Sequence, residues 1–284
     1  MDLSVVLGGR DDNYGENFIP RLKQSLENNL SKLDKSGLDY EMIVVDFNPL
    51  NNQYLHKNNL LEEVLSHPKI KNIIVDNSVV LAENLGPTTY YEYFAKNVGC
   101  KNSSGELIFI TNSDIIITDC LIDEIVKEVK NKDKNDYFYR VRYRGEISLG
   151  MIPDESNEPV EDLHHPEFPD ACICGLYSGD SSMFSRDVLF NVATAYNEGE
   201  MRHRTHVHQS AMDGEILWNV YRKGKKLRFL EAHYYHIFHG PRPQRDNFYH
   251  QGTYENTEDW GFVKYPKEKI NENIVLIRAW ISLL

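Results

Sequence analysis

The amino-acid sequence predicts an α/β fold with a mostly parallel central sheet flanked by helices. Short runs rich in valine and isoleucine alternate with segments whose apolar residues recur every three or four positions. Strands separated by helices form βαβ units, and their right-handed crossovers place the strands parallel in one sheet. Glycine, proline and asparagine end several of these runs, where the chain must turn.

The first three elements follow this alternation closely. Residues 3–9, LSVVLGG, read as a buried strand that two glycines end. Residues 18–33 are predicted to be a helix, because five apolar residues recur at helical spacing, namely Ile19, Leu22, Leu26, Leu30 and Leu33. Residues 40–49, YEMIVVDFNP, are the second strand, which Asn48 and Pro49 stop.

The next elements complete the first half of the chain. Residues 60–67 are predicted to form a short helix, and residues 71–77 a third strand. Residues 92–105 read as a helix closed by its last residue, a glycine. Residues 106–117, ELIFITNSDIII, are the predicted fourth strand, and the amphipathic segment 120–129 follows it.

The sequence changes in character after residue 145. Residues 146–170 carry four prolines with acidic residues between them, so we expect a loop or flap over the sheet. A helix around residues 214–222 and a strand over 226–238 come next. We expect one domain over residues 1–245, whose halves divide after residue 145, and a C-terminal extension over 246–284 that packs on it.

Composition excludes several classes of protein. The 284 residues are 41% hydrophobic and 26% charged, which is too apolar for a disordered chain. Lys and Arg number 31 against 43 Asp and Glu, a formal charge of −12 that disfavours nucleic-acid binding. Four cysteines without a C-x-x-C pair indicate a reducing compartment, and no run approaches a membrane span, so a cytoplasmic protein is expected.

The residues that end the predicted strands lie at the edge where such sheets bind ligands. They are Gly8, Gly9, Arg10, Asp46, Asp76, Asn112 and Asp114. A carboxylate at the end of a buried strand is costly unless it is hydrogen-bonded or bound to a cation. Asp114 therefore indicates either a metal site or a cap for the helix expected near Asp119.

Histidines supply a second group of candidate metal ligands. Seven of the eleven lie between positions 203 and 250, and the sequence HYYHIFHG places His233, His236 and His239 three residues apart. On an alternating strand His236 and His239 would face opposite sides, so at least one must lie in a turn if both point into one site. Imidazole together with carboxylate suits Mn²⁺ or Zn²⁺, although histidines bonded to the backbone remain the alternative.

Two carboxylates, Asp213 and Glu215, open the helix predicted around residues 214–222. The helix macrodipole favours acids at this position without any function. If the helix starts at the ligand-binding edge, Asp213 is also well placed as a general base.

Taken in order, six segments resemble a family 2 type glycosyltransferase of a bacterial and viral branch, over roughly residues 3–240. The segments are SVVLGGRDD, EMIVVDFNP, AKNVGCKNSSGELIFITNSD, GDSSMFSRDVL, MDGEILWNVYRKGKKL and HIFH. The resemblance implies the Rossmann-like glycosyltransferase A fold, in which a nucleotide-sugar donor lies across the carboxyl edge of the sheet. Residues 1–145 would then be the nucleotide-sugar-binding half and residues 146–245 the acceptor and catalytic half.

The resemblance also implies a role for individual residues. Donor binding would fall to Gly9, Arg10, Asp12, Asp46, Lys96, Asn97 and Asn112. Asp114 matches the aspartate that binds Mn²⁺ or Mg²⁺ on the pyrophosphate, and His239, with His236 as competitor, resembles the late metal-ligand histidine. Asp213 matches the acid that deprotonates the acceptor, and Asp180 is the rival base.

The sequence thus predicts an inverting, metal-assisted transferase that moves a sugar from a UDP- or GDP-sugar to a hydroxyl of a glycan acceptor. One alternative is a nucleotidyltransferase with a similar sheet, although GGRDDNYG holds two acids that would oppose a triphosphate. The other is a degenerate donor-binding module without catalysis. Asn112 favours it, because Asn112 replaces the usual first aspartate of the D-x-D metal motif.

Overall fold

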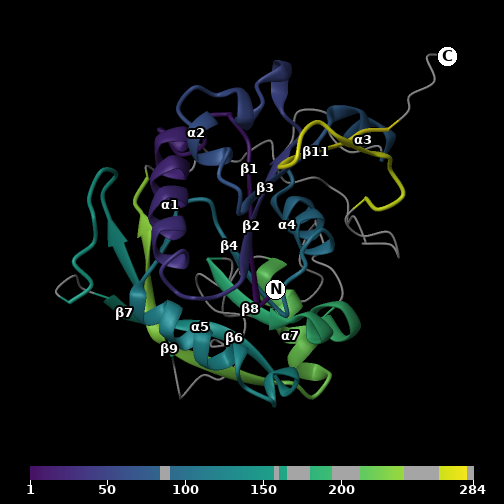
Figure 1. The fold of residues 1–284 in the computed structure, drawn as a ribbon. Coiled ribbons are helices and arrows are strands. Elements are labelled where there is room, and N and C mark those ends of the chain that lie inside the picture. Colours follow the sequence, from purple (N-terminus) through teal and green to yellow (C-terminus); the bar gives the residue numbers. More distant parts are fainter. Residues whose placement is uncertain (84–89, 157–159, 165–179, 194–211, 240–261, 280–284) are drawn as a thin grey trace, which may run out of the picture.

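Strands from both halves of the chain form one sheet in this computed structural model (Figure 1). The structure describes residues 1–83, 90–156, 160–164, 180–193, 212–239 and 262–279, except for the side chains of residues 212–215. The parallel part of the sheet contains, in spatial order, β11 (Ile274–Ile277), β3 (Ile70–Val75), β2 (Tyr40–Phe47), β1 (Leu3–Gly9) and β4 (Leu107–Thr111). The short strand β10 (Lys267–Lys269) adds an antiparallel edge beside β11.

The remaining strands continue the sheet beyond β4 with mixed directions. In spatial order they are β8 (Ser181–Ser185), β6 (Tyr137–Ile147), β9 (Lys226–Ile237) and β5 (Ile115–Ile117), and β7 (Val160–Asp162) pairs with β6. Only β6 and β9 pair in parallel here, whereas the other contacts are antiparallel. The predicted fold class is confirmed, with its parallel strands concentrated in the N-terminal half.

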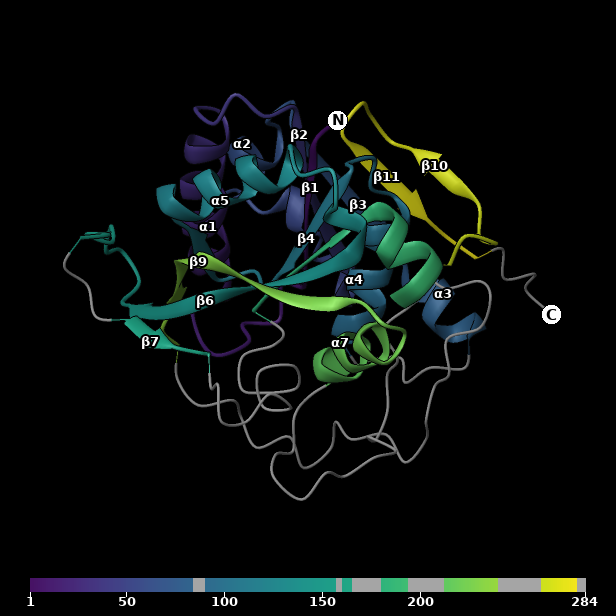
Figure 2. The ribbon, with the colours of Figure 1, turned by 90° about the horizontal axis from the view of Figure 1, so that it is seen from below.

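Helices cover both faces of the sheet (Figures 1 and 2). On one face, α1 (Phe18–Leu33) and α5 (Asp119–Val129) bury their apolar sides in one core, next to the short helix α2 (Glu62–Leu65). On the other face, α3 (Asn77–Ala82), α4 (Glu92–Lys101) and α7 (Met212–Arg222) pack in a second core. Each strand between these layers is apolar on both sides, which explains its continuous valine and isoleucine runs.

The predicted fourth strand, residues 106–117, is two strands in the structure. β4 ends at Thr111, the chain bends through residues 112–114, and β5 then pairs antiparallel with β9 rather than continuing beside β1. The bend exists because β5 has a different partner, which lies more than a hundred residues away in the sequence.

A polar stripe on α1 holds β5 in this position. Arg21, Ser25 and Asn29 are four residues apart and are buried on one side of the helix. Ser25 Oγ and Asn29 Nδ2 donate to the carbonyl of Ile115 at 2.6 and 2.9 Å, and the Ile117 amide donates to Asn29 Oδ1 at 2.8 Å. These side chains therefore satisfy the backbone groups that the exposed edge of β5 would leave unpaired.

Two predicted helices are shorter than expected. The helix predicted over residues 60–67 is the four-residue α2, and the helix predicted to close at Gly105 ends at Lys101. A Cβ atom at Gly105 would lie 2.4 Å from the Ser4 amide nitrogen. That glycine therefore allows close approach to the start of β1 rather than ending a helix.

The predicted flap over residues 146–170 is described at 146–156 and 160–164. Its first two residues belong to β6, and β7 pairs with Tyr143–Gly145 of β6. This part of the segment is therefore a hairpin extension of the sheet, while residues 165–170 lie outside the described ranges.

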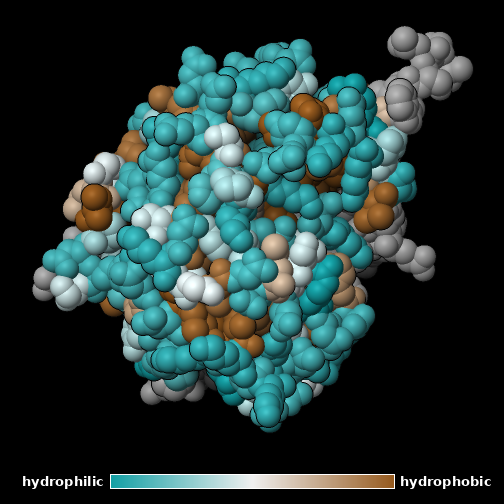
Figure 3. Space-filling model, in the orientation of Figure 1, coloured by the Kyte–Doolittle hydropathy of each residue, from teal (hydrophilic) through white to brown (hydrophobic). Residues whose placement is uncertain are grey.

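Among the residues that the structure describes, no helix has the length and apolarity needed to cross a bilayer. Hydrophilic residues cover most of the face in Figure 3.

Candidate metal and donor site

Asp114 lies in the bend that separates β4 from β5, at the carboxyl edge of the parallel strands. Its backbone carbonyl accepts a hydrogen bond from the Ile237 amide at 2.9 Å, which fixes the bend against the end of β9. The residue is only 5% exposed, so its carboxylate needs partners. It does not cap α5, because the capping oxygen there is that of Thr118, which accepts from the Leu121 amide.

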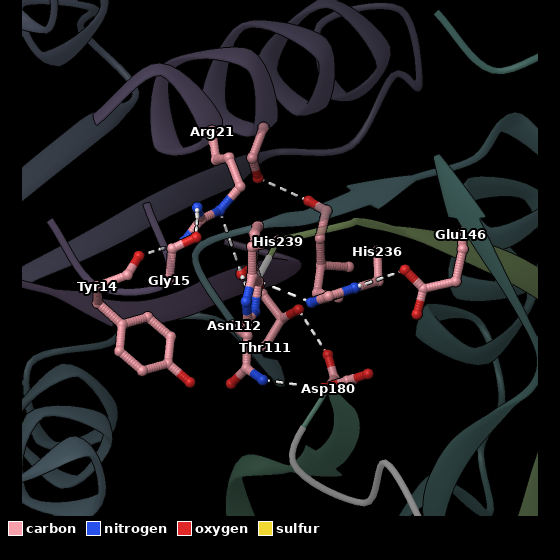
Figure 4. A network of polar contacts seen from close by, with 12 residues as sticks. Tyr14, Gly15, Arg21, Thr111, Asn112, Glu146, Asp180, His236 and His239 are labelled. Carbon is pink, nitrogen blue, oxygen red and sulfur yellow. Dashed lines mark hydrogen bonds and ion pairs between the residues drawn. The ribbon is translucent and has the colours of Figure 1, made fainter. Parts of the chain in front are cut away.

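Two histidines face this carboxylate. Nε2 of His236 is 3.6 Å and Nε2 of His239 is 3.5 Å from Asp114 Oδ2, and one ligand atom from each of the three residues lies within 4.8 Å of the others. Figure 4 shows both rings directed toward this point. His236 lies on β9 and His239 lies two residues beyond the end of that strand, as the expected turn requires. We call Asp114, His236 and His239 the triad.

The triad suits a divalent cation by the chemistry of its donors. A carboxylate and two imidazoles are ligands for Mn²⁺ and Zn²⁺, and their atoms already lie around one point. The buried carboxylate faces the Arg21 guanidinium and the two imidazole rings, and it does not cap a helix. These residues fit a metal ion.

Glu146 holds His236 from the far side of the ring. Its Oε2 lies 2.9 Å from His236 Nδ1, which leaves Nε2 for the triad. Burial lowers the pKa of His236, but the hydrogen bonds with Asp114 and Glu146 outweigh burial and raise the pKa to about 9. Burial raises the pKa of Asp114, and the two histidines and Arg21 reverse that effect, so the net shift is downward.

Arg21 of α1 closes the other side of the triad. Its Nε atom is 3.8 Å from Asp114 Oδ2. Its other nitrogens donate to the carbonyls of Tyr14 and Gly15 (Figure 4) and to that of Glu16. The distances to the first two carbonyls are 2.6 and 3.1 Å. The guanidinium thus holds the loop after β1 against the triad. Burial lowers the pKa of Arg21, and the charge of Asp114 opposes that shift.

A second polar chain runs beside the triad through Asn112. Lys96 Nζ of α4 donates to Asn112 Oδ1 at 3.0 Å, and Asn112 Nδ2 donates to Asp180 Oδ1 at 2.9 Å. Lys96 also pairs with Glu92 at 2.9 Å and is 1% exposed. The amide of Asn112 is therefore engaged at both ends, and its oxygen faces the Lys96 ammonium instead of the triad.

Asp180 is held on its other oxygen by two groups. Arg144 Nε donates to Oδ2 at 2.9 Å, and the hydroxyl of Tyr234 donates to the same atom at 3.2 Å. Burial lowers the pKa of Arg144, but nearby negative charges, of which Asp180 is the strongest, outweigh burial and raise the pKa above its usual value. Both oxygens of the Asp180 carboxylate therefore accept hydrogen bonds from other side chains.

Asp46 ends β2 in a fully buried position. Its Oδ2 accepts from the Leu55 amide at 2.8 Å, while Oδ1 has no hydrogen-bond partner among the described residues. Burial raises the pKa of Asp46 to about 7, with Leu55 and Arg10 opposing the shift and Asp11 adding to it. This leaves a hydrogen-bonding position open on a buried carboxyl, which is unusual because most buried polar groups have a partner.

The loop after β1 contributes the other predicted donor residues. Arg10 is buried and pairs with Asp12 through two hydrogen bonds of 3.0 and 2.8 Å. A Cβ atom at Gly9 would lie 2.7 Å from the Phe18 ring, so a side chain at this position would clash unless the ring moved. Asn97 is buried on α4 beside Lys96. Gly9, Arg10 and Asp12 thus lie at the carboxyl end of β1.

Asp213 is in the first turn of α7, as predicted for the helix start. Its side chain, like that of Glu215, lies outside the described residues. Its assignment as the base therefore stays a prediction.

Sequence reasoning missed Arg21, Glu146 and Arg144. Arg21 had a signal, since it shares the spacing of Ser25 and Asn29 on a helix that is otherwise apolar on its buried side. Glu146 and Arg144 had none, because β6 was not expected as a strand and its partners lie 90 and 36 residues away in the sequence.

Comparisons with known proteins find structures of similar fold. No family model and no curated protein sequence matches the chain. Residues 1–349 of Staphylococcus aureus TarS, solved in complex with UDP-GlcNAc, superpose with a TM-score of 0.53 at 14% identity, over 87% of this chain and 62% of that one. The chain shares the TarS fold.

A longer TarS structure gives a TM-score of 0.50 at 16% identity and covers 84% of this chain and 37% of that chain. A mannosyltransferase from Pyrobaculum calidifontis in complex with GDP-Man and Mn²⁺ reaches 0.46 at 14% identity, over 86% and 58%, which is too low to define a shared fold. The chain spans less than two thirds of the length of each of these structures. At these identities the likeness to TarS extends to the fold alone.

Proposed function

We propose that the chain is a glycosyltransferase that moves a sugar from a nucleotide-diphosphate sugar to a hydroxyl of a glycan acceptor, with inversion and with help from a metal ion. The observation that carries the proposal is the triad, which lies at the carboxyl edge of parallel strands in a TarS fold. This edge is where open α/β sheets bind nucleotides. TarS itself has been solved with UDP-GlcNAc.

Asp114, His236 and His239 would hold the cation, Mn²⁺ or Mg²⁺. When bound, such an ion neutralises negative charge on a diphosphate and so stabilises it as a leaving group. The two histidines favour Mn²⁺ over Mg²⁺, because Mg²⁺ prefers oxygen ligands. Glu146 fixes the ring of His236 and so sets which nitrogen faces the ion.

The donor would lie between Asp46 and the triad. Oδ1 of Asp46, which has no partner among the described residues, offers an acceptor to a base or ribose. Arg10 and Lys96 bring two buried cations to the same edge. Lys96 reaches Asn112 and Glu92 at present. A diphosphate at this edge would compete with Asn112 for the Lys96 ammonium. A neutral amide holds an ammonium less tightly than a carboxylate does. This explains why Asn112 stands where the D-x-D motif usually has an aspartate.

Asp213 is the proposed base, which removes the acceptor proton while the hydroxyl attacks the anomeric carbon. Asp180 is the weaker candidate, because Asn112, Arg144 and Tyr234 already occupy its oxygens. Direct attack by the acceptor on the carbon that bears the diphosphate gives inversion at that carbon.

The proposal is tested by incubating purified protein with UDP- and GDP-sugars in the presence of Mn²⁺ and following nucleotide release. Slow hydrolysis that yields a nucleoside diphosphate and free sugar is expected for a transferase. In a parallel incubation with a nucleoside triphosphate and a sugar phosphate, release of inorganic diphosphate would instead support the nucleotidyltransferase. Binding of a nucleotide sugar without any turnover, with acceptors supplied, would support the non-catalytic module.

A further inference from the structure

A second cluster of ligand-type side chains lies away from the triad, on the other side of β9. Cys120 in the first turn of α5, Glu155 in the segment after β6 and His233 on β9 each offer a ligand atom, and these atoms lie within 4.8 Å of one another. His233 and His236 are three residues apart on one strand, so they point to opposite faces. The proposed transferase reaction does not use this cluster.

The contact between cysteine and histidine already has nearly the geometry of a metal site. Cys120 Sγ lies 3.2 Å from His233 Nδ1. Around a tetrahedral zinc ion, with Zn–S near 2.3 Å and Zn–N near 2.0–2.1 Å, a sulfur and a nitrogen ligand are about 3.6 Å apart. A shift of a few tenths of an ångström would therefore let both atoms bind one ion.

Glu155 is currently held by a lysine. Lys32 Nζ of α1 binds Glu155 Oε1, and Glu155 Oε2 accepts from the Asp119 amide at 2.9 Å. Lys32 also contacts the exposed carboxylate of Asp119 at 2.8 Å. Because Asp119 remains as an anionic partner for Lys32, Glu155 can turn one oxygen to a metal without leaving the ammonium unpaired.

We propose that Cys120, His233 and Glu155 form a binding site for a thiophilic divalent cation of the Zn²⁺ class, with water in the fourth position. Thiolate, imidazole and carboxylate are together the ligand set of zinc rather than of Mg²⁺. The thiol releases its proton to solvent when the ion binds. The bound ion would tie α5, β9 and the segment after β6 together, and so strengthen the strand that carries His236.

Cobalt titration tests the site, because a thiolate ligand gives Co²⁺ a charge-transfer absorption that the sulfur-free triad cannot give. The chain with Cys172→Ser and Cys174→Ser is used, so that these two cysteines cannot contribute. We expect the band to saturate with Co²⁺ and to be reversed by Zn²⁺. Asp114→Asn, which disables the triad, should keep the band and saturate it at one Co²⁺ per chain, and Cys120→Ser should abolish it. No band in the parent chain, or a band that survives Cys120→Ser, would overturn the proposal.

Lys32→Met should raise the affinity for Zn²⁺, a result that misfolding of the variant could not produce. Removal of the competing ion pair should tighten Zn²⁺ binding by about threefold, as expected for a partly exposed pair. His233→Gln should lose the band. Its folding is checked by comparing its thermal unfolding with that of the parent chain, both in chelator. If Lys32→Met leaves the affinity unchanged or lowers it, Glu155 is not a ligand and the proposed site fails.

Discussion

Glu146 and His236 are direct neighbours in the register of the parallel strands β6 and β9, and their side chains meet at 2.9 Å. The register therefore places a carboxylate behind the imidazole that faces Asp114. This arrangement fixes the orientation of the ring and makes its Nε2 a better ligand. It links a strand with no obvious functional signature in the sequence to the candidate metal site.

Glu146→Gln should weaken Mn²⁺ binding. Loss of the carboxylate leaves the ring of His236 less firmly oriented and less basic, and a loss of about 10- to 100-fold in metal affinity is typical of such partners. Isothermal titration of Mn²⁺ in the presence of a nucleoside diphosphate measures the change. Glu231→Gln is the matched control, since Glu231 lies on β9 and pairs with Arg142 at the surface, away from the triad. Equal affinities for the two variants would contradict the role of Glu146.

Asp114→Asn should remove the metal-dependent part of nucleotide binding. With Mn²⁺ present, a nucleoside diphosphate at a hundredfold excess over its dissociation constant should stabilise the wild-type chain by about 2.7 kcal/mol. With chelator the stabilisation should be smaller, because the diphosphate charge is then not neutralised. Thermal unfolding with and without Mn²⁺ measures both, and Asp123→Asn on the exposed side of α5 is the control.

A variant at Asp114 that keeps the full difference between Mn²⁺ and chelator would place the metal elsewhere. Equal stabilisation of the wild-type chain under both conditions would remove the metal from nucleotide binding altogether.

Asp46→Asn should make the chain more stable above neutral pH. The pKa of Asp46 is raised by burial to about 7, so between about pH 4 and pH 7 the folded state holds a proton that the unfolded state has lost. The wild-type chain therefore loses stability as pH rises through this range, and the neutral amide does not. Urea unfolding should show the advantage of the variant growing by more than about 1 kcal/mol from pH 5 to pH 8.

The same variant should bind nucleotide more weakly if Asp46 Oδ1 accepts a hydrogen bond from the ligand. A variant that is no more stable at pH 8 than at pH 5, relative to wild type, would show that Asp46 is ionised at little cost. Unchanged nucleotide affinity would remove Asp46 from the donor site.

Asp213→Asn and Asp180→Asn should fail in different ways. Asp213→Asn should keep nucleotide binding and lose turnover by roughly 10²- to 10⁴-fold, as expected when a general base is removed. Asp180→Asn should lower stability, because it weakens the buried ion pair with Arg144. Steady-state kinetics with urea unfolding separates these results. Normal turnover in Asp213→Asn, with a folded but inactive Asp180→Asn, would exchange their roles.

Much of the N-terminal half could be predicted from local sequence. The strands β1, β2 and β3 and the helices α1 and α5 lie close to the residues expected for them, because each shows its own period of apolar residues. The meeting of Asp114 with a late histidine came from the resemblance to a glycosyltransferase family, and the structure brings both His236 and His239 to that carboxylate.

Other features depended on partners distant in the sequence. The bend at residues 112–114 could not be predicted, since ELIFITNSDIII reads as one strand until β9 draws its end away. The engagement of Asn112 at both ends and of Asp180 on both oxygens likewise depends on side chains that the sequence does not place next to them.

The fold class, the polar residues at the strand ends and the types of ligand could all be predicted, because they depend on local periodicity and side-chain chemistry. Three features needed the folded chain: Glu146 rather than another acid supports His236, Lys96 faces Asn112, and Asp46 keeps an acceptor atom without a described partner. For Glu146 the reason is strand register, since a shift of one residue would turn its side chain to the other face of the sheet. For Lys96 and Asp46 the reason is burial among residues distant in the sequence.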